Sequence, residues 1–217
     1  MIRISALESV PEFAQGVVRD FRVRWALEEA GLPYEVRLLA QRDQKSDRYR
    51  CLQPFGQVPS FEDGDLTLFE SGAIVLHIAE KSDALLPKDT EGRSRARTWV
   101  FAALNTVEPN IQELAGIDFF WPGQAWTKER RPMVEKMVRQ RLGELAQSMN
   151  GNEYLDERFT AGDLMMSAVL RILRHTDILA DFPSLAAYRA RCEARPAFRR
   201  AIDAQMADFK KERAEAS

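Results

Sequence analysis

The segment Val58-Pro-Ser-Phe-Glu-Asp-Gly-Asp-Leu-Thr-Leu-Phe69 contains two short apolar stretches around an acidic turn with a glycine. This pattern predicts a β-hairpin, because such stretches suit strands and glycine suits the turn between them. Residues 71–81, directly after it, have helical spacing. Earlier in the chain, Ile2–Leu7 and Tyr34–Leu39 alternate like strands, and the helix formers of Arg22–Ala30 lie between them. The predicted order is therefore β-α-β, a mostly polar stretch, then β-β-α.

The rest of the chain has no convincing strand pattern. Helical spacing recurs over Glu91–Leu114, Lys128–Met149, Ala161–Arg174, Ser184–Ala194 and Pro196–Lys210. We therefore expect a small α/β domain over residues 1–82, a linker over 83–90, and an all-helical domain over 91–217.

Composition excludes several classes of function. The 217 residues carry 31 Lys and Arg against 33 Asp and Glu, a net charge of −2, which argues against a broad nucleic-acid surface. No apolar run reaches the roughly 18–20 residues that cross a bilayer, and the N-terminus lacks the apolar core of a signal peptide. Two cysteines and two histidines make a disulfide framework or a zinc site unexpected. We expect a cytoplasmic protein that binds no metal, membrane or nucleic acid.

Five sequence segments, in this order along the chain, are informative together. They are Arg22-Val-Arg-Trp-Ala-Leu-Glu-Glu-Ala-Gly-Leu-Pro-Tyr34, Gln53-Pro-Phe-Gly-Gln-Val-Pro-Ser-Phe61, Phe69-Glu-Ser-Gly-Ala-Ile74, Phe159-Thr-Ala-Gly-Asp163 and Arg195-Pro-Ala-Phe-Arg-Arg-Ala201. Together they resemble the glutathione transferase family, of a cytosolic and bacterial-like type. The resemblance implies a thioredoxin-like α/β N-terminal domain (β-α-β-α-β-β-α) followed by an all-α C-terminal domain. It also implies glutathione as cosubstrate, a homodimer and a role in detoxification.

The Val58-Pro59 step is the first element of the implied glutathione site. In the family this proline is cis, and the residue before it offers its backbone N–H and C=O to glutathione, which pairs with it like an added strand. Without the resemblance, a trans proline at a strand start would be the ordinary interpretation. The resemblance also places Gln57, Gln44 and Lys45 at glutathione, the last two near its glycine carboxylate, although Lys45 could equally be a solvated surface residue.

The Glu70-Ser71 pair is the second element. It falls where a predicted strand gives way to a helix, and a helix N-terminus binds carboxylates through its unpaired N–H groups. The resemblance implies that Ser71 binds the γ-glutamyl carboxylate and that Glu70 pairs with the ammonium group. Ser71 could also be simply a helix N-cap. Thr160 and Asp163 form a capping box, which we interpret as structural.

The residue that activates the thiol is where the resemblance fails. The family usually uses Tyr, Ser or Cys near the junction of the first strand and first helix. Counting back from Arg22, that position falls within residues 17–20, where the chain has Val, Val, Arg and Asp. The absence of Cys there also disfavours redox chemistry.

Two explanations remain open. Apolar residues recur every four positions from Phe13 to Trp25, so the helix could begin near Pro11, with Ser9 beside its N-terminus as the donor to the thiolate. Alternatively, Gln15-Gly16 could form a turn and the helix could begin near Val18. Its N–H groups and Arg19 would then stabilise the thiolate. Ser9 and Arg19 are the candidate catalytic residues.

The second substrate binds, by resemblance, against the early helices of the helical domain. The aromatic-rich break at Phe119, Phe120, Trp121 and Trp126, with Phe101 and Asn105 from the preceding helix, suits an apolar pocket. The leading hypothesis is conjugation of the glutathione thiolate to an apolar electrophilic small molecule. One alternative is a glutathione-binding, non-catalytic or regulatory member of the same fold. The other is a glutathione-dependent isomerase or dehalogenase.

Overall fold

The computed structural model describes residues 1–215, with side chains described through Phe209. The chain divides into two compact units, Met1–Leu85 together with residues from Arg195 onward, and Leu86–Ala194. The predicted division differs at the C-terminus, because it assigned all of residues 91–217 to the helical domain. Residues 216 and 217 of that predicted domain lie outside the described part.

The first unit is built on a four-stranded mixed sheet in the order β2-β1-β3-β4. The strands are β1 (Ile2–Leu7), β2 (Tyr34–Leu39), β3 (Ser60–Asp63) and β4 (Leu66–Phe69). β1 and β2 are parallel, whereas β1–β3 and β3–β4 are antiparallel. The predicted hairpin is confirmed, with Gly64 in its turn at φ +61°. This is the expected thioredoxin-like arrangement.

Three α-helices connect or follow these strands. They are α1 (Asp20–Ala30), α2 (Asp47–Arg50) and α3 (Ser71–Ala79), and the short 3-10 segments η1 (Glu12–Ala14) and η2 (Asp43–Lys45) precede the first two. α1 ends at Gly31, whose φ of +67° provides the left-handed C-cap expected from the sequence.

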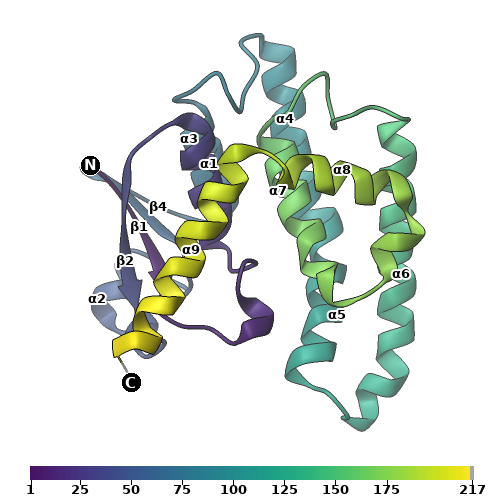
Figure 1. Ribbon diagram of the computed structural model, residues 1–217, viewed down its shortest axis with the longest axis horizontal. Coiled ribbons are helices and arrows are strands. Elements are labelled where there is room, and N and C mark those ends of the chain that lie inside the picture. The colour runs from purple at the N-terminus through teal and green to yellow at the C-terminus, as the bar shows by residue number, and fades with distance from the viewer. Residues whose placement is uncertain (216–217) are drawn as a thin grey trace. The chain divides into compact units, whose positions relative to one another are not determined.

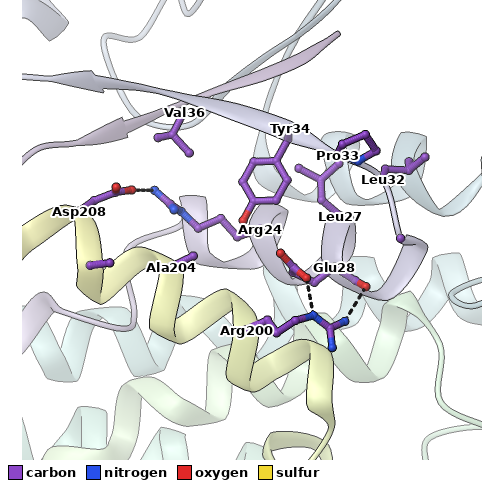
Figure 2. A pocket seen from close by; sticks show the side chains of 12 residues that line it. Arg24, Leu27, Glu28, Leu32, Pro33, Tyr34, Val36, Arg200, Ala204 and Asp208 are labelled. Atoms are coloured by element: carbon purple, nitrogen blue, oxygen red, sulfur yellow. Dashed lines mark hydrogen bonds and ion pairs between the residues drawn. The ribbon is translucent and has the colours of Figure 1, made fainter.

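The last helix, α9 (Pro196–Glu215), belongs to the first unit and lies beside α1 (Figure 1). Phe198 packs edge-on against Phe21 and Trp25, with ring centroids 5.2 and 5.0 Å apart. A pocket of about 730 Å³ lies among β2, α1 and α9, bordered by the Arg24–Asp208 and Glu28–Arg200 ion pairs (Figure 2). Helical periodicity showed that α9 has an apolar face, but not which element that face contacts.

The second unit is entirely helical. It contains α4 (Thr90–Ala102), a π-helical segment η3 (Ala103–Val107), α5 (Glu108–Phe120), α6 (Ala125–Met149), α7 (Ala161–Leu170), the 3-10 segments η4 (Arg171–His175) and η5 (Ile178–Asp181), and α8 (Pro183–Glu193). The single helix predicted over 91–114 is thus interrupted by a π-segment and runs on to residue 120. Every residue of α7 is buried, so this helix forms the centre of the unit.

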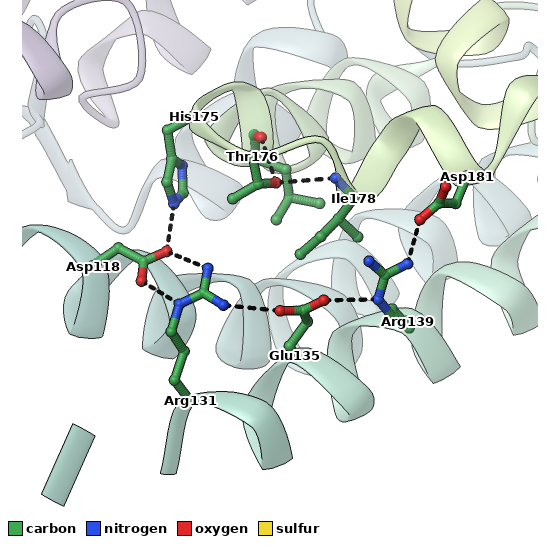
Figure 3. Close-up of polar contacts among 9 residues, drawn as sticks. Asp118, Arg131, Glu135, Arg139, His175, Thr176, Ile178 and Asp181 are labelled. Atoms are coloured by element: carbon green, nitrogen blue, oxygen red, sulfur yellow. Dashed lines mark hydrogen bonds and ion pairs between the residues drawn. The ribbon is translucent and has the colours of Figure 1, made fainter. Parts of the chain in front are cut away.

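Two polar features fix the helices of this unit. The predicted capping box at the start of α7 is confirmed. The Thr160 hydroxyl accepts from the backbone N–H of Gly162, and the Asp163 carboxylate accepts from the backbone N–H of Thr160. A chain of ion pairs runs Asp118–Arg131–Glu135–Arg139–Asp181 and joins α5, α6 and η5 (Figure 3). Across the described residues, no helix combines the length and apolar character needed to span a bilayer.

Candidate functional site

The predicted glutathione-binding residues come from loops at one end of the sheet. Ser60 pairs with Phe69, so the residues just outside this ladder, Pro59 and Glu70, lie at the same end of the hairpin. Phe61 pairs with Ile4 in the antiparallel β1–β3 ladder, which puts the C-terminal end of β1 at that end as well. β2 is parallel to β1 and ends there too, so the Gln44-Lys45 segment that follows it joins the same edge. Topology therefore places the predicted glutathione-binding residues of this unit at one end of the sheet.

The Val58-Pro59 peptide bond is cis, as predicted. The loop before this peptide bond is held by the buried phenol of Tyr49, which donates to the Gln57 carbonyl at 2.6 Å. Ser5 Oγ lies 2.7 Å from the same phenol and accepts from the Ser60 N–H, also at 2.7 Å. These hydrogen bonds fix Gln57 and Val58 just before the start of β3. Sequence patterns did not indicate a role for Tyr49 or Ser5, because their roles depend on contacts between distant segments.

Gly56 brings the Gln44-Lys45 segment against this loop. Its φ is +62°, and a Cβ built on it would lie 2.7 Å from the Gln44 carbonyl oxygen, closer than real atoms approach. Only glycine fits both constraints. Gln44 is half-buried and Lys45 exposed, so their side chains can reach a ligand lying over Gln57.

Glu70 and Ser71 stand at the start of α3, as predicted. Glu70 occupies the N-cap position with φ +67°, a conformation rare for a residue with a side chain and costing about 1–3 kcal/mol, which concentrates at ligand-binding sites. Ser71 is buried, and its Oγ accepts from Nη1 of the buried Arg22 at 3.4 Å. The Ser71 hydroxyl proton is then directed away from Arg22 and can be donated to an anion at the helix N-terminus.

The segment before α1 decides between the two explanations for thiol activation. Gly16 has φ +76° and α1 begins at Asp20, with Arg19 as its N-cap. A continuous helix from Pro11 is therefore wrong, since Gly16 turns the chain, and the turn at Gln15-Gly16 is confirmed. Ser9 therefore does not directly precede the start of α1 along the chain, and the role of Ser9 at the thiol stays a prediction.

The groups around the start of α1 are suited to an anion. Among the described residues, the Val18 N–H has no backbone acceptor. Asp20 cannot serve as the acid or base, because it is only 1% exposed and its carboxylate accepts from both Arg24 and Gln205. Since Arg22 of α1 bonds Ser71 of α3, the N-terminal turns of these two helices converge, and both favour negative charge.

Comparisons with known proteins agree with this geometry. Residues 14–80 match the family model for the glutathione S-transferase N-terminal domain. The chain is 30% identical over 196 residues to a glutathione S-transferase of Hyoscyamus muticus, covering 84% of this chain and 92% of that protein. The chain belongs to the glutathione transferase family. Glutathione S-transferase F10 of Arabidopsis thaliana is 31% identical over 152 residues, 65% of this chain and 66% of the relative.

A glutathione transferase of Burkholderia graminis has a similar structure. Its TM-score is 0.82 at 27% identity, covering 93% of this chain and 87% of that one, and it was crystallised with two glutathione molecules bound per subunit. Some relatives of this chain have the broader name of glutathione S-transferase-like protein. One is gedE of Aspergillus terreus, which is 38% identical over 104 residues and matches 45% of this chain and 46% of that protein.

The residues predicted to bind the second substrate all lie in the helical unit of this chain. Phe120, Trp121 and Trp126 form an exposed aromatic cluster, with neighbouring ring centroids 6.4 and 5.7 Å apart. Phe119 differs, since it is half-buried against His175 with centroids 4.6 Å apart. Phe101 is exposed on α4, and Asn105 is exposed in the π-segment, a distortion often found at functional sites. Among the side chains that the structure describes, through Phe209, no group of three or more acidic, His and Cys residues could hold a metal ion.

Proposed function

We propose that this protein is a glutathione transferase that conjugates the glutathione thiolate to an apolar electrophilic small molecule. The observation that carries the proposal is the convergence of the cis Val58-Pro59 step with the Glu70-Ser71 helix start at one end of the sheet. The first suits an extended peptide and the second suits an amino-acid head group, and glutathione contains both.

Each part of glutathione has a partner in this proposal. Val58 pairs its backbone with the cysteinyl residue, as strand addition requires. Ser71 donates to the γ-glutamyl carboxylate at the N-terminus of α3, while the exposed carboxylate of Glu70 faces the ammonium group. Gln44, Lys45 and Gln57 take the glycine end, where Lys45 supplies the opposite charge.

The thiol is activated by its surroundings in this proposal. The α1 N-terminus, the Val18 N–H and the Arg19 cation stabilise the thiolate, with Ser9 as an additional donor. The thiol proton passes to solvent, the sulfur lone pair forms the new S–C bond, and the leaving group departs with the electron pair of its former bond. For an epoxide, the ring oxygen takes that pair and then a proton.

The remaining features concern the electrophile and assembly. Phe101, Asn105, Phe119, Phe120, Trp121 and Trp126 supply the aromatic, apolar surroundings of the electrophile. The exposed aromatic pair Phe55 and Phe69, at 66% and 38% exposure, supports a homodimer, because large exposed aromatics on a soluble unit commonly mark protein contacts. Cytoplasmic detoxification is the role we propose.

A conjugation assay tests this function. Purified protein is incubated with glutathione and a panel of aryl halides, epoxides and isothiocyanates, and the loss of free thiol is measured. We expect conjugation with at least one electrophile, reduced in Arg19→Ala. Glutathione binding without thiol loss would favour the non-catalytic alternative, and conversion of the electrophile with glutathione returned would favour an isomerase. Neither binding nor conjugation would overturn the proposal.

A further inference from the structure

Gln205 of α9 makes an unusual contact with the segment before α1. Its side chain is completely buried, at 0% exposure. The Gly16 N–H donates to its Oε1 at 3.1 Å, and its Nε2 donates to Asp20 Oδ1 at 2.8 Å. One amide therefore holds both ends of a five-residue segment, Gly16–Asp20, from a helix 189 positions further along the chain.

The contact belongs to a larger buried cluster. Asp20 Oδ2 accepts from Arg24 Nε at 2.9 Å. Arg24 Nη2 donates to Asp208 Oδ2 at 2.7 Å, the ion pair drawn in Figure 2. Both oxygens of Asp20 are thus engaged, one by Gln205 and one by Arg24. The Oε1 and Nε2 atoms of Gln205 thus each have a hydrogen-bond partner at an ordinary distance.

Attachment of α9 does not by itself require this cluster. Phe198 already packs on α1, and Arg195 and Arg200 form ion pairs with Glu29 and Glu28. Buried polar groups cost desolvation and stabilise a fold little more than well-packed apolar groups would. The specific effect of the Gln205 amide is to set the direction of the backbone between Gly16 and Asp20. It holds Gly16 in its left-handed conformation and fixes Asp20 as the first residue of α1.

We propose that Gln205 is a positioning residue for thiol activation, which fixes Gly16–Asp20 so that the Val18 N–H and Arg19 are presented to the thiolate. The inference rests on the proposed function. It assigns a part of the reaction to α9, which supplies none of the residues proposed above to bind glutathione.

Replacing the amide with an apolar side chain of similar length tests this role. Gln205→Met should lower kcat about tenfold or more, since small misplacements of activating groups have effects of this size. The kcat–pH profile should move upward by about one pH unit, because the thiolate loses stabilisation. KM for glutathione should change less than about threefold, since Val58, Glu70 and Ser71 hold the peptide elsewhere.

A conservative variant adds a rescue. A protonated glutamic acid has a carbonyl that accepts from Gly16 and an O–H that donates to Asp20, whereas its ionised form lacks the donor and repels Asp20. The kcat of Gln205→Glu, divided by that of the wild type, should therefore rise as the pH falls. A flat ratio would contradict the positioning role.

Phe198→Leu is the matched control, because it loosens the packing of α9 on Phe21 and Trp25 and removes no hydrogen bond of Gly16 or Asp20. It should lower Tm while leaving the kcat–pH profile unchanged. If Gln205→Met reproduced the control, with a lower Tm and a wild-type profile, the inference alone would be overturned. A wild-type protein that fails to activate glutathione would overturn both the inference and the proposed function.

Discussion

Replacing Asp163 with alanine tests how strongly the start of α7 holds the helical unit together. The Asp163 side chain is completely buried. One of its oxygens accepts from the Leu155 N–H at 2.8 Å and the Tyr188 O–H at 3.0 Å. The other accepts from the N–H and the hydroxyl of Thr160, at 2.9 and 3.1 Å. Asp163→Ala leaves four buried donors without this acceptor.

The expected loss follows from these contacts. Each buried donor left unpaired costs about 1–3 kcal/mol, before the surroundings relax. Burial raises the pKa of the Asp163 carboxyl, although its hydrogen bonds oppose that shift, so removing the charge recovers part of the cost. We therefore expect Asp163→Ala to lower the free energy of unfolding by about 3–4 kcal/mol, a large fraction of an ordinary domain's stability.

Urea and thermal unfolding measure this loss. A decrease of this size corresponds to a Tm lower by about 6–16 °C for a chain of this length. Asp156→Asn is the control, because Asp156 pairs with Arg95, whose side chain is 47% exposed, and an ion pair at the surface should contribute at most about 1 kcal/mol. A loss for Asp163→Ala no greater than that of Asp156→Asn would contradict this expectation.

Three further variants probe other parts of the structure. Gly56→Ala should destabilise the protein by at least about 1–2 kcal/mol and weaken glutathione binding, because its left-handed φ and its contact with the Gln44 carbonyl exclude a Cβ; unchanged unfolding and affinity would contradict this. Partial burial raises the pKa of Asp118, but hydrogen bonds from Arg131 and His175 lower it overall. The Asp118 carboxylate therefore stabilises the fold above its unfolded pKa, and this contribution is lost as the pH falls through its folded pKa. Asp118→Asn should therefore reduce Tm near neutral pH and match the wild type more closely below about pH 4; a constant difference at all pH values would be inconsistent. Glu70→Gln should weaken glutathione binding about threefold to tenfold in calorimetry, through loss of the charge facing the ammonium group; an unchanged Kd would remove Glu70 from the site.

The sequence predicted the parts of this protein that depend on local patterns. The hairpin at 58–69 follows from its apolar stretches and Gly64, and the capping box at Thr160 follows from residue types at fixed spacing. The cis Val58-Pro59 step was predicted only through the resemblance, because base rates alone favour a trans bond.

Features that depend on contacts between distant segments were not predicted. Tyr49 supports the Gln57 carbonyl only because the sheet brings Ser5 and α2 together. The attachment of α9 to α1 depends on which apolar face Phe198 meets, and periodicity does not specify a partner. The break at Gly16 was one of two open alternatives, since a four-residue apolar repeat continued through it and concealed the turn.

The proposed function requires that this chain recognises the γ-glutamyl end of glutathione through the start of α3. Calorimetric titration of wild type and Ser71→Ala with glutathione and with cysteinylglycine, which lacks the γ-glutamyl group, tests it most directly. We predict that the wild type binds glutathione more tightly, and that Ser71→Ala loses about 10–100-fold in affinity for glutathione alone, the value of one hydrogen bond to a charged group. Equal binding of both ligands by the wild type, or an equal loss for both in the variant, would contradict the claim.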